Sequence, residues 1–145
     1  MQRLKLSSTL SASGPAQGAI AEYLEQGGYD RHLRRLRETL QTQQARMADA
    51  IAQAFPAGTR VTRPQGGFFL WLELPPAVDA LALHRQALAR GISVAPGPIF
   101  SASGQFGSAL RLNYGHPWDA GAQDAVHALG KLAREACRRP ADRQT

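Results

Sequence analysis

The chain has 145 residues, of which 43% are hydrophobic and 19% charged, a balance typical of one globular domain. No apolar run is long enough to span a bilayer, and residues 1–14 lack the compact apolar centre of a secretory signal, so we expect a cytoplasmic protein with no membrane partner. The single cysteine, Cys137, excludes an internal disulfide.

The net charge of +6 arises from 15 arginines and 2 lysines set against 11 acidic residues. Such a surplus is compatible with nucleic-acid binding. However, the arginines are spread along the sequence, and a solvated helix face explains their densest group more simply than a DNA-binding groove does. That group is Arg31, Arg34, Arg35 and Arg37.

Two helices are predicted in the first third of the chain. After a polar lead-in, a helix begins near Pro15, capped by Ser13 or Gly14, and ends at Gly27-Gly28. A longer helix follows Asp30, its expected N-cap, and stops before Pro56. Residues 31–55 would span about 37 Å at 1.5 Å per residue, so this helix is expected to run between two layers or domains.

A change of period after Pro56 predicts a small sheet with helices packed on it. The segment 68–74 is apolar on both faces except at Glu73, which favours a central strand. The other expected elements are a short strand at 60–63, a helix from Asp79 to Gly91 with Leu81, His84, Ala87 and Leu88 on its inner stripe, strands at 92–95 and 109–114, a loop at 96–107, and a helix from Asp119 to about Cys137.

These elements predict an α+β fold in which two lead-in helices precede a compact sheet and helix layer. We expect residues 1–56 to form the lead-in segment and 57–137 the small α+β domain. Residues 138–145 are polar and are expected to form a disordered tail.

The strand at 109–114 carries the most informative side chain. Alternation places Leu110, Leu112 and Tyr114 on one face and Ala109, Arg111 and Asn113 on the other. An arginine between two leucines in a strand is a candidate for binding a carboxylate through two parallel hydrogen bonds. On spacing alone, an edge-strand arginine that faces water or pairs with a nearby acid remains the stronger interpretation.

Other chemistry is weakly indicated. The four histidines lack metal-ligand spacing, so no metal site is predicted, and Ser101 and Ser103 have no adjacent histidine and acid that would form a hydrolase triad. Lys5 and Lys131 could each form a Schiff base in principle, but a solvated position is the simpler interpretation for both.

Four segments, taken in order, resemble one family. They are YDRHLRRLR at 29–37, GTRVTRPQGGFFLWLELP at 58–75, GISVAPGPIFSASGQF at 91–106 and LRLNYGHPW at 110–118. Together they resemble the C-terminal region of MocR-type regulators, GntR-family proteins in which a winged helix is fused to a fold-type-I, class I/II aminotransferase-like domain that uses pyridoxal 5′-phosphate (PLP). The similarity extends from about residue 1 to about residue 134.

The resemblance implies the small C-terminal domain of the PLP-dependent aminotransferase fold and assigns roles by position. Arg111 matches the arginine that grips the carboxylate of an amino acid substrate or effector, and Asn113 accompanies it on the same strand face. Gly97 and Phe100 belong to the loop that closes over the substrate. Ser13 lies in a stretch that can approach the cofactor of the partner in a homodimer. No catalytic residue is assigned.

The same resemblance places the Schiff-base lysine and most phosphate contacts upstream of Met1. We therefore expect PLP in the full-length parent and none bound by these 145 residues alone, which are expected to be inactive by themselves. DNA would be bound only through an N-terminal winged helix outside this sequence.

Three alternatives stay open on the sequence. The chain could be the small domain of a true class I aminotransferase, a basic nucleic-acid-binding domain, or an interaction module that dimerises through the helices at 15–55. Salt-dependent binding to duplex DNA would mark the second, and concentration-dependent light scattering the third.

Overall fold

The computed structural model describes residues 13–138, and the chain forms two compact units with their boundary between Thr39 and Leu40. The dividing point falls inside one long helix, α3 (Gly28–Ala54). Residues 1–12 and 139–145, which include Lys5 and almost all of the expected disordered tail, lie outside the described part. Within 13–138, no helix has both the length and the hydropathy that crossing a membrane requires.

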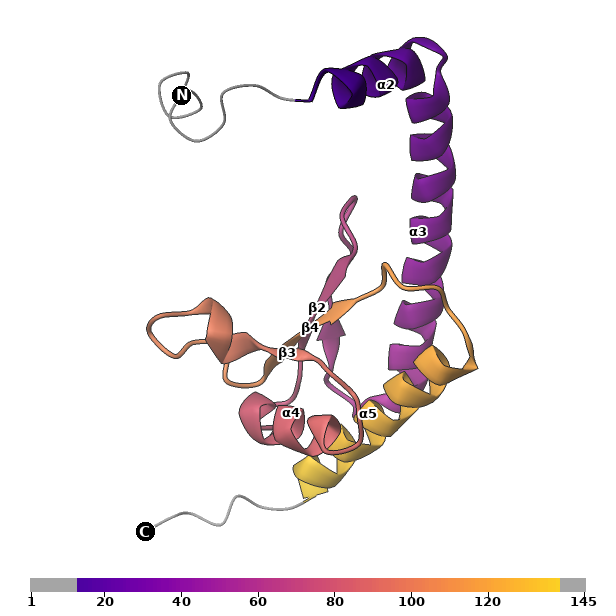
Figure 1. Cartoon of the computed structure of the whole chain (residues 1–145). Coiled ribbons are helices and arrows are strands. Elements are labelled where there is room, and N and C mark those ends of the chain that lie inside the picture. Colours follow the sequence, from indigo (N-terminus) through magenta and orange to yellow (C-terminus); the bar gives the residue numbers. More distant parts are fainter. Residues whose placement is uncertain (1–12, 139–145) are drawn as a thin grey trace. The chain divides into compact units, whose positions relative to one another are not determined.

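The first unit contains α2 (Gly14–Glu25) and the beginning of α3 (Figure 1). The helix start predicted near Pro15 is confirmed, and Gly27, at φ +67°, separates the two helices as expected. The prediction that Asp30 caps the second helix is wrong, because α3 begins at Gly28 and Asp30 lies in its first turn. An acid there still interacts favourably with the helix dipole.

The second unit is built on a four-stranded antiparallel sheet in the order β1-β2-β4-β3. Its strands are β1 (Arg60–Val61), β2 (Phe69–Glu73), β3 (Ala95–Pro96) and β4 (Ala109–Asn113). The interior position predicted for the segment 68–74 is confirmed, since β2 pairs with β1 on one side and β4 on the other.

The strand predicted at 92–95 is largely wrong, because only its last residue belongs to β3. The backbone N–H of Ile92 donates to the carbonyl of Ala87 and closes the end of α4 (Ala80–Leu88) instead of joining the sheet. Gly91, at φ +75°, provides the left-handed turn that such a helix ending needs.

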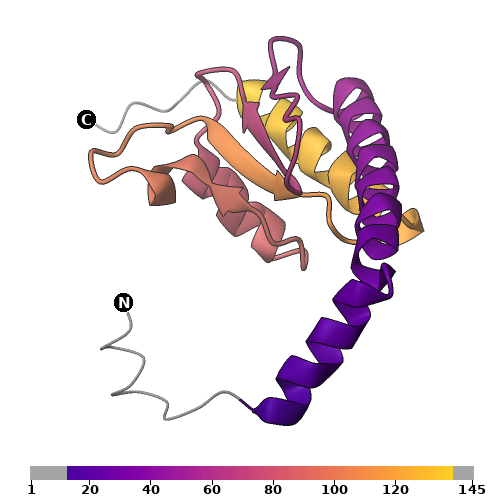
Figure 2. The same cartoon turned by 90° about the horizontal axis from the view of Figure 1, so that it is seen from above.

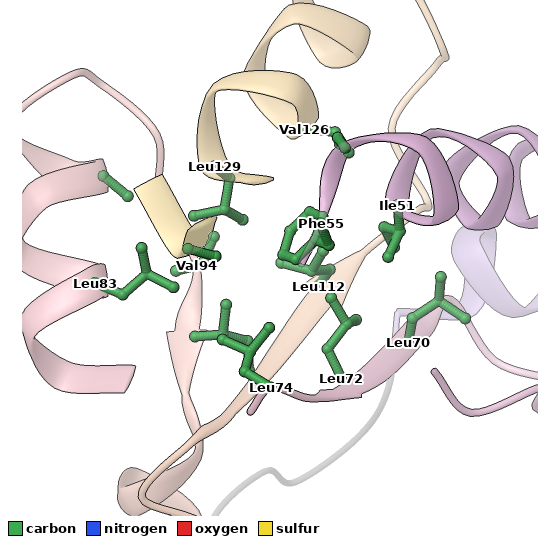
Figure 3. Close-up of a cluster of buried hydrophobic side chains, with 14 of the residues drawn as sticks. Ile51, Phe55, Leu70, Leu72, Leu74, Leu83, Val94, Leu112, Val126 and Leu129 are labelled. Carbon is green, nitrogen blue, oxygen red and sulfur yellow. The ribbon is translucent and has the colours of Figure 1, made fainter. Parts of the chain in front are cut away.

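One face of the sheet is buried under helices. Leucines at alternate positions of β2 and β4 meet α4, α5 (Ala120–Arg138) and the C-terminal half of α3, in the cluster of buried side chains shown in Figure 3. Figure 1 shows α4 and α5 running beneath the strands. The most completely buried large side chains are Ile51, Leu70, Leu72, Leu83, Leu110, Leu129 and Leu132.

The inner stripe of α4 differs from the prediction. Ala80, Leu83 and Ala87 are buried, while Leu81 and Leu88 are 39% and 54% exposed. The sequence of α4 offers leucines on more than one side, and contact with α5 and β3 selects the stripe that contains Leu83.

Candidate functional site

Arg111 projects from the middle of β4, on the face of the sheet opposite the helices. Its neighbours Leu110 and Leu112 are buried in the core, so alternation turns Arg111 the other way. It lies directly opposite Trp71 of β2 on one side and Ala95 of β3 on the other. Because β4 is an interior strand, the interpretation of Arg111 as an edge-strand residue does not apply.

The guanidinium group of Arg111 lies over two phenyl rings. Its central carbon, Cζ, is 4.2 Å from the ring centroid of Phe69 and 4.5 Å from that of Phe100. Rings at these distances attract a cation through their electron-rich faces. Phe69 comes from β2, and Phe100 ends the short 3-10 helix η1 (Gly97–Phe100), so two segments distant in sequence converge on this group.

No carboxylate and no hydrogen-bond acceptor within residues 13–138 engages the guanidinium of Arg111. The side chain is half-buried, and the contacts that the described residues make with its guanidinium come from the two aromatic rings. The phenyl rings offer no oxygen acceptor, so the five N–H donors of the guanidinium remain available to a partner. A carboxylate can accept two of those hydrogen bonds in the guanidinium plane.

Gly97 brings the loop close to the sheet. A Cβ atom added at position 97 would overlap the carbonyl oxygen of Phe106 and lie 3.0 Å from the Cβ of Ala109, so only glycine allows this approach. Gly97 follows β3 directly, and the pairing of Ala95 with Arg111 carries η1 to the side of the guanidinium.

Trp71 and Phe106 are two further aromatic residues in the surroundings of Arg111, and the sequence did not identify either of them as part of the site. Trp71 packs edge-on against Phe100 and Phe106, with ring centroids 5.8 Å and 5.2 Å apart. The strand alternation that places Arg111 also puts Phe69 and Trp71 on a shared face of β2, but only the register between β2 and β4 shows that this face meets Arg111.

Asn113 shares the face of Arg111 but is exposed, and its Oδ1 accepts a hydrogen bond of 2.7 Å from the backbone N–H of Gly115. Its side-chain NH₂ is the group left to meet a ligand. Ser13 belongs to the first unit, where it stands at the N-cap position of α2 without a side-chain capping bond. The structure brings Arg111, Phe100 and Gly97 together, with Asn113 beside them, and the cofactor-binding role of Ser13 stays a prediction.

The described residues do not fit PLP, which needs a lysine for its Schiff base together with a phosphate cradle. Lys131, the lysine within 13–138, is exposed on α5, whose inner face packs against the core on the far side of the sheet from Arg111. No group of three or more metal-ligating side chains occurs in that part of the chain either. The group that this site offers to a ligand is the guanidinium of Arg111, whose donors suit an anion.

A sheet covered by helices on one face, with an arginine on its open face, is the arrangement expected of the small domain of an aminotransferase. Comparison with known proteins shows that the chain belongs to the family Aminotransferase class I and II, whose model matches residues 1–129. It carries part of the aminotransferase-like domain that MocR-type regulators share with aminotransferases.

Relatives of both kinds are similar to the chain. An uncharacterised HTH-type transcriptional regulator of Escherichia coli, YdcR, is 42% identical over 93% of this chain and 29% of its own length. A second regulator from E. coli, YjiR, is 39% identical over 83% of the chain and 26% of its own length. The 2-aminoadipate transaminase of Thermus thermophilus is 34% identical over 81% of the chain and 30% of that protein. The chain thus spans less than a third of these relatives.

The fold is also similar to solved structures. The crystal structure of LysN, an α-aminoadipate aminotransferase from T. thermophilus complexed with N-(5′-phosphopyridoxyl)-L-leucine, matches with a TM-score of 0.80 and 30% identity. The match covers 93% of this chain and 34% of that one. A multiple-substrate aminotransferase from Thermococcus profundus matches with a TM-score of 0.73 and 26% identity, over 81% of this chain and 29% of its own.

Proposed function

We propose that this chain is the C-terminal part of an aminotransferase-like transcriptional regulator of the MocR type, and that Arg111 binds the carboxylate of an amino acid substrate or effector. The observation that supports this role is the state of Arg111: it is half-buried against two rings and has no acidic partner among the described residues. A cation held in this way is available to an anion from outside the chain.

The similar proteins support the same proposal. The two regulators are more similar to the chain than the 2-aminoadipate transaminase is, which favours a regulator. LysN was solved with an amino acid joined to the phosphopyridoxyl group. An amino acid is therefore the ligand class that we assign to Arg111.

In this proposal PLP, the Schiff-base lysine and the DNA-binding winged helix belong to the remainder of a longer, homodimeric polypeptide. PLP, when bound there, supplies the electron sink that activates the amino acid at Cα. Arg111 supplies orientation, since two hydrogen bonds to one carboxylate fix both the position and the direction of the ligand. Such positioning is a large contribution in reactions between bound groups.

The carboxylate role can be tested on the chain itself by nuclear magnetic resonance. We expect sodium propionate, added at constant ionic strength against sodium chloride, to shift the Arg111 Nε–Hε signal in a saturable manner, whereas propionamide does not. Arg111→Lys keeps the charge but loses the planar fork on which the two hydrogen bonds depend, so saturable binding of propionate is expected to be lost. Arg85→Lys, which changes an exposed arginine of α4, is the matched control and should bind propionate like the original chain. Equal shifts with propionate and chloride would rule the role out.

A true aminotransferase is the second candidate, favoured by the 34% identity to the 2-aminoadipate transaminase. The coding sequence that precedes Met1 separates the two. A winged helix followed by a large domain with a Ser-Lys segment indicates the regulator, and the large domain alone indicates the enzyme.

A further inference from the structure

An unusual feature of Arg111 is that, among residues 13–138, the partners of its guanidinium are aromatic rings. We propose that Phe69 and Phe100 are positioning residues, which hold the guanidinium plane of Arg111 so that its edge meets a carboxylate in that plane, and that Trp71 holds Phe100 in place. The inference rests on the proposed carboxylate role of Arg111.

The stack supports this role because it restricts the guanidinium without using any of its donors. An arginine side chain has several rotatable bonds, and immobilising it when a ligand binds weakens the affinity. An acidic partner would also immobilise Arg111, but it would occupy the edge that a ligand needs. Two rings at 4.2 and 4.5 Å remove this conflict, because they hold the cation through their electron-rich faces and contribute no carboxylate that would occupy its donors.

Trp71 links the stack to the loop that carries Phe100. It lies opposite Arg111 in the sheet register, and its ring meets Phe100 at an interplanar angle of 66° and Phe106 at 86°. Phe106 adopts a φ of +64°, which a non-glycine residue rarely does, and this backbone accompanies the contact of its ring with Trp71. Both ends of the segment from Phe100 to Phe106 are therefore held by one indole.

The exposure of the residues in η1 supports a specific role for Phe100. Ile99, the preceding residue, is 62% exposed, whereas Phe100 is 41% exposed and the centroid of its ring lies 4.5 Å from Cζ of Arg111. The two neighbours are therefore a matched pair: a change at 99 alters the same loop and the same apolar surface without touching the guanidinium.

The first test uses the ligand-free chain. A proton above an aromatic ring is shielded, so we expect the Arg111 Hε signal to lie upfield of the other arginine Hε signals and to move downfield in Phe100→Leu, which keeps an apolar side chain but has no ring. The upfield position of the Arg111 Hε signal should be kept in Phe100→Tyr, which retains a ring, and in Ile99→Ala. In Trp71→Leu the upfield shift should be reduced. An Arg111 signal that is unshifted in the original chain, or insensitive to Phe100→Leu, would overturn the stack.

The second test measures the dissociation constant for propionate. Loss of one cation–π contact is expected to weaken binding about two- to fivefold in Phe100→Leu and in Phe69→Leu. Phe100→Tyr and Ile99→Ala should bind like the original chain, and unchanged methyl spectra of the core leucines should show that each variant remains folded. If Phe100→Leu bound propionate equally well, the positioning role would be wrong while the carboxylate role stood. If the original chain bound no propionate, both would be wrong, even with the stack present.

Discussion

Gly130 in the middle of α5 lies directly against the backbone of Ala54 at the end of α3. A Cβ atom added at position 130 would be 2.6 Å from the carbonyl carbon of Ala54 and 2.8 Å from its Cβ. No real Cβ atom tolerates such distances to another backbone, so glycine at 130 sets how closely the two helices pack. These helices cover the inner face of the sheet, and their spacing therefore determines the shape of the core beneath β2 and β4.

We predict that Gly130→Ala destabilises the chain even though alanine favours helix. Forcing apart two packed helices costs about 1–3 kcal/mol, which exceeds the gain of about 1 kcal/mol from replacing glycine in a helix. Gly121→Ala in the same helix is the control, because the only close atom is Oδ1 of Asp119 at 3.4 Å. Chemical denaturation should show a lower midpoint for Gly130→Ala and an equal or higher midpoint for Gly121→Ala. A stabilised Gly130→Ala variant would mean that α3 and α5 do not approach as closely as described.

Gly97→Ala should affect both stability and ligand binding. The added methyl group would meet the backbone of Phe106, so the loop must move, at a cost of about 1–3 kcal/mol. Since the loop carries Phe100, we also expect weaker binding of propionate. Gly107→Ala, in the same loop but with no atom within 4 Å of the added Cβ, should change the free energy of unfolding by less than about 0.5 kcal/mol. Denaturation and propionate titration of the two variants, side by side, check this pair of expectations.

Asp79 contributes to stability through the N-terminus of α4. Its Oδ1 accepts hydrogen bonds from the backbone N–H groups of Leu81 and Ala82, at 2.8 and 3.0 Å. Replacing an N-cap of this kind by alanine costs about 1 kcal/mol. Asp79→Ala should therefore lower the free energy of unfolding by that amount, whereas Asp79→Ser, which keeps a capping oxygen, should recover most of the loss. Equal stability of the alanine and serine variants in urea denaturation would contradict the capping role.

The sequence was sufficient where a local pattern determines the structure. Alternation in the segment 109–114 places Leu110 and Leu112 inside and Arg111 outside, and the capping position of Asp79 follows from residue type alone. Local pattern failed at 92–95, because Ile92 completes the end of a helix through a hydrogen bond to Ala87 that no strand propensity reveals.

The surroundings of Arg111 illustrate a second limit. Phe69, Trp71 and Phe100 reach this arginine only through the pairing of β2 with β4 and of β3 with β4, which is a long-range property of the sheet. The sequence identified Arg111 as a candidate because it interrupts a run of leucines. It could not show that the partners of this cation are aromatic rings, since nothing local to the strand encodes them.

Tyr114 should make the stability of the chain depend on pH in the alkaline range. The residue follows β4 and is 3% exposed, and its hydroxyl donates a hydrogen bond of 3.0 Å to the carbonyl of Gly67. Burial raises the pKa of the Tyr114 phenol above its ordinary value of 10.0, because the charged phenolate is poorly solvated there. The folded state then holds the proton more tightly than the unfolded state does. The resulting stabilisation is complete below the unfolded pKa and is lost as the pH rises through the folded pKa.

We therefore expect the free energy of unfolding to fall as the pH is raised above about 10, the ordinary tyrosine pKa. Part of this fall should be absent in Tyr114→Phe, which has no group to ionise at that position. Tyr29→Phe is the matched control, because Tyr29 is 45% exposed and the change should leave the alkaline fall as it is in the original chain. Denaturation midpoints of the three chains, measured from neutral pH to pH values above 10, provide the comparison. Parallel curves for the original chain and Tyr114→Phe would show that folding does not hold the proton of this phenol more tightly, which would contradict the prediction.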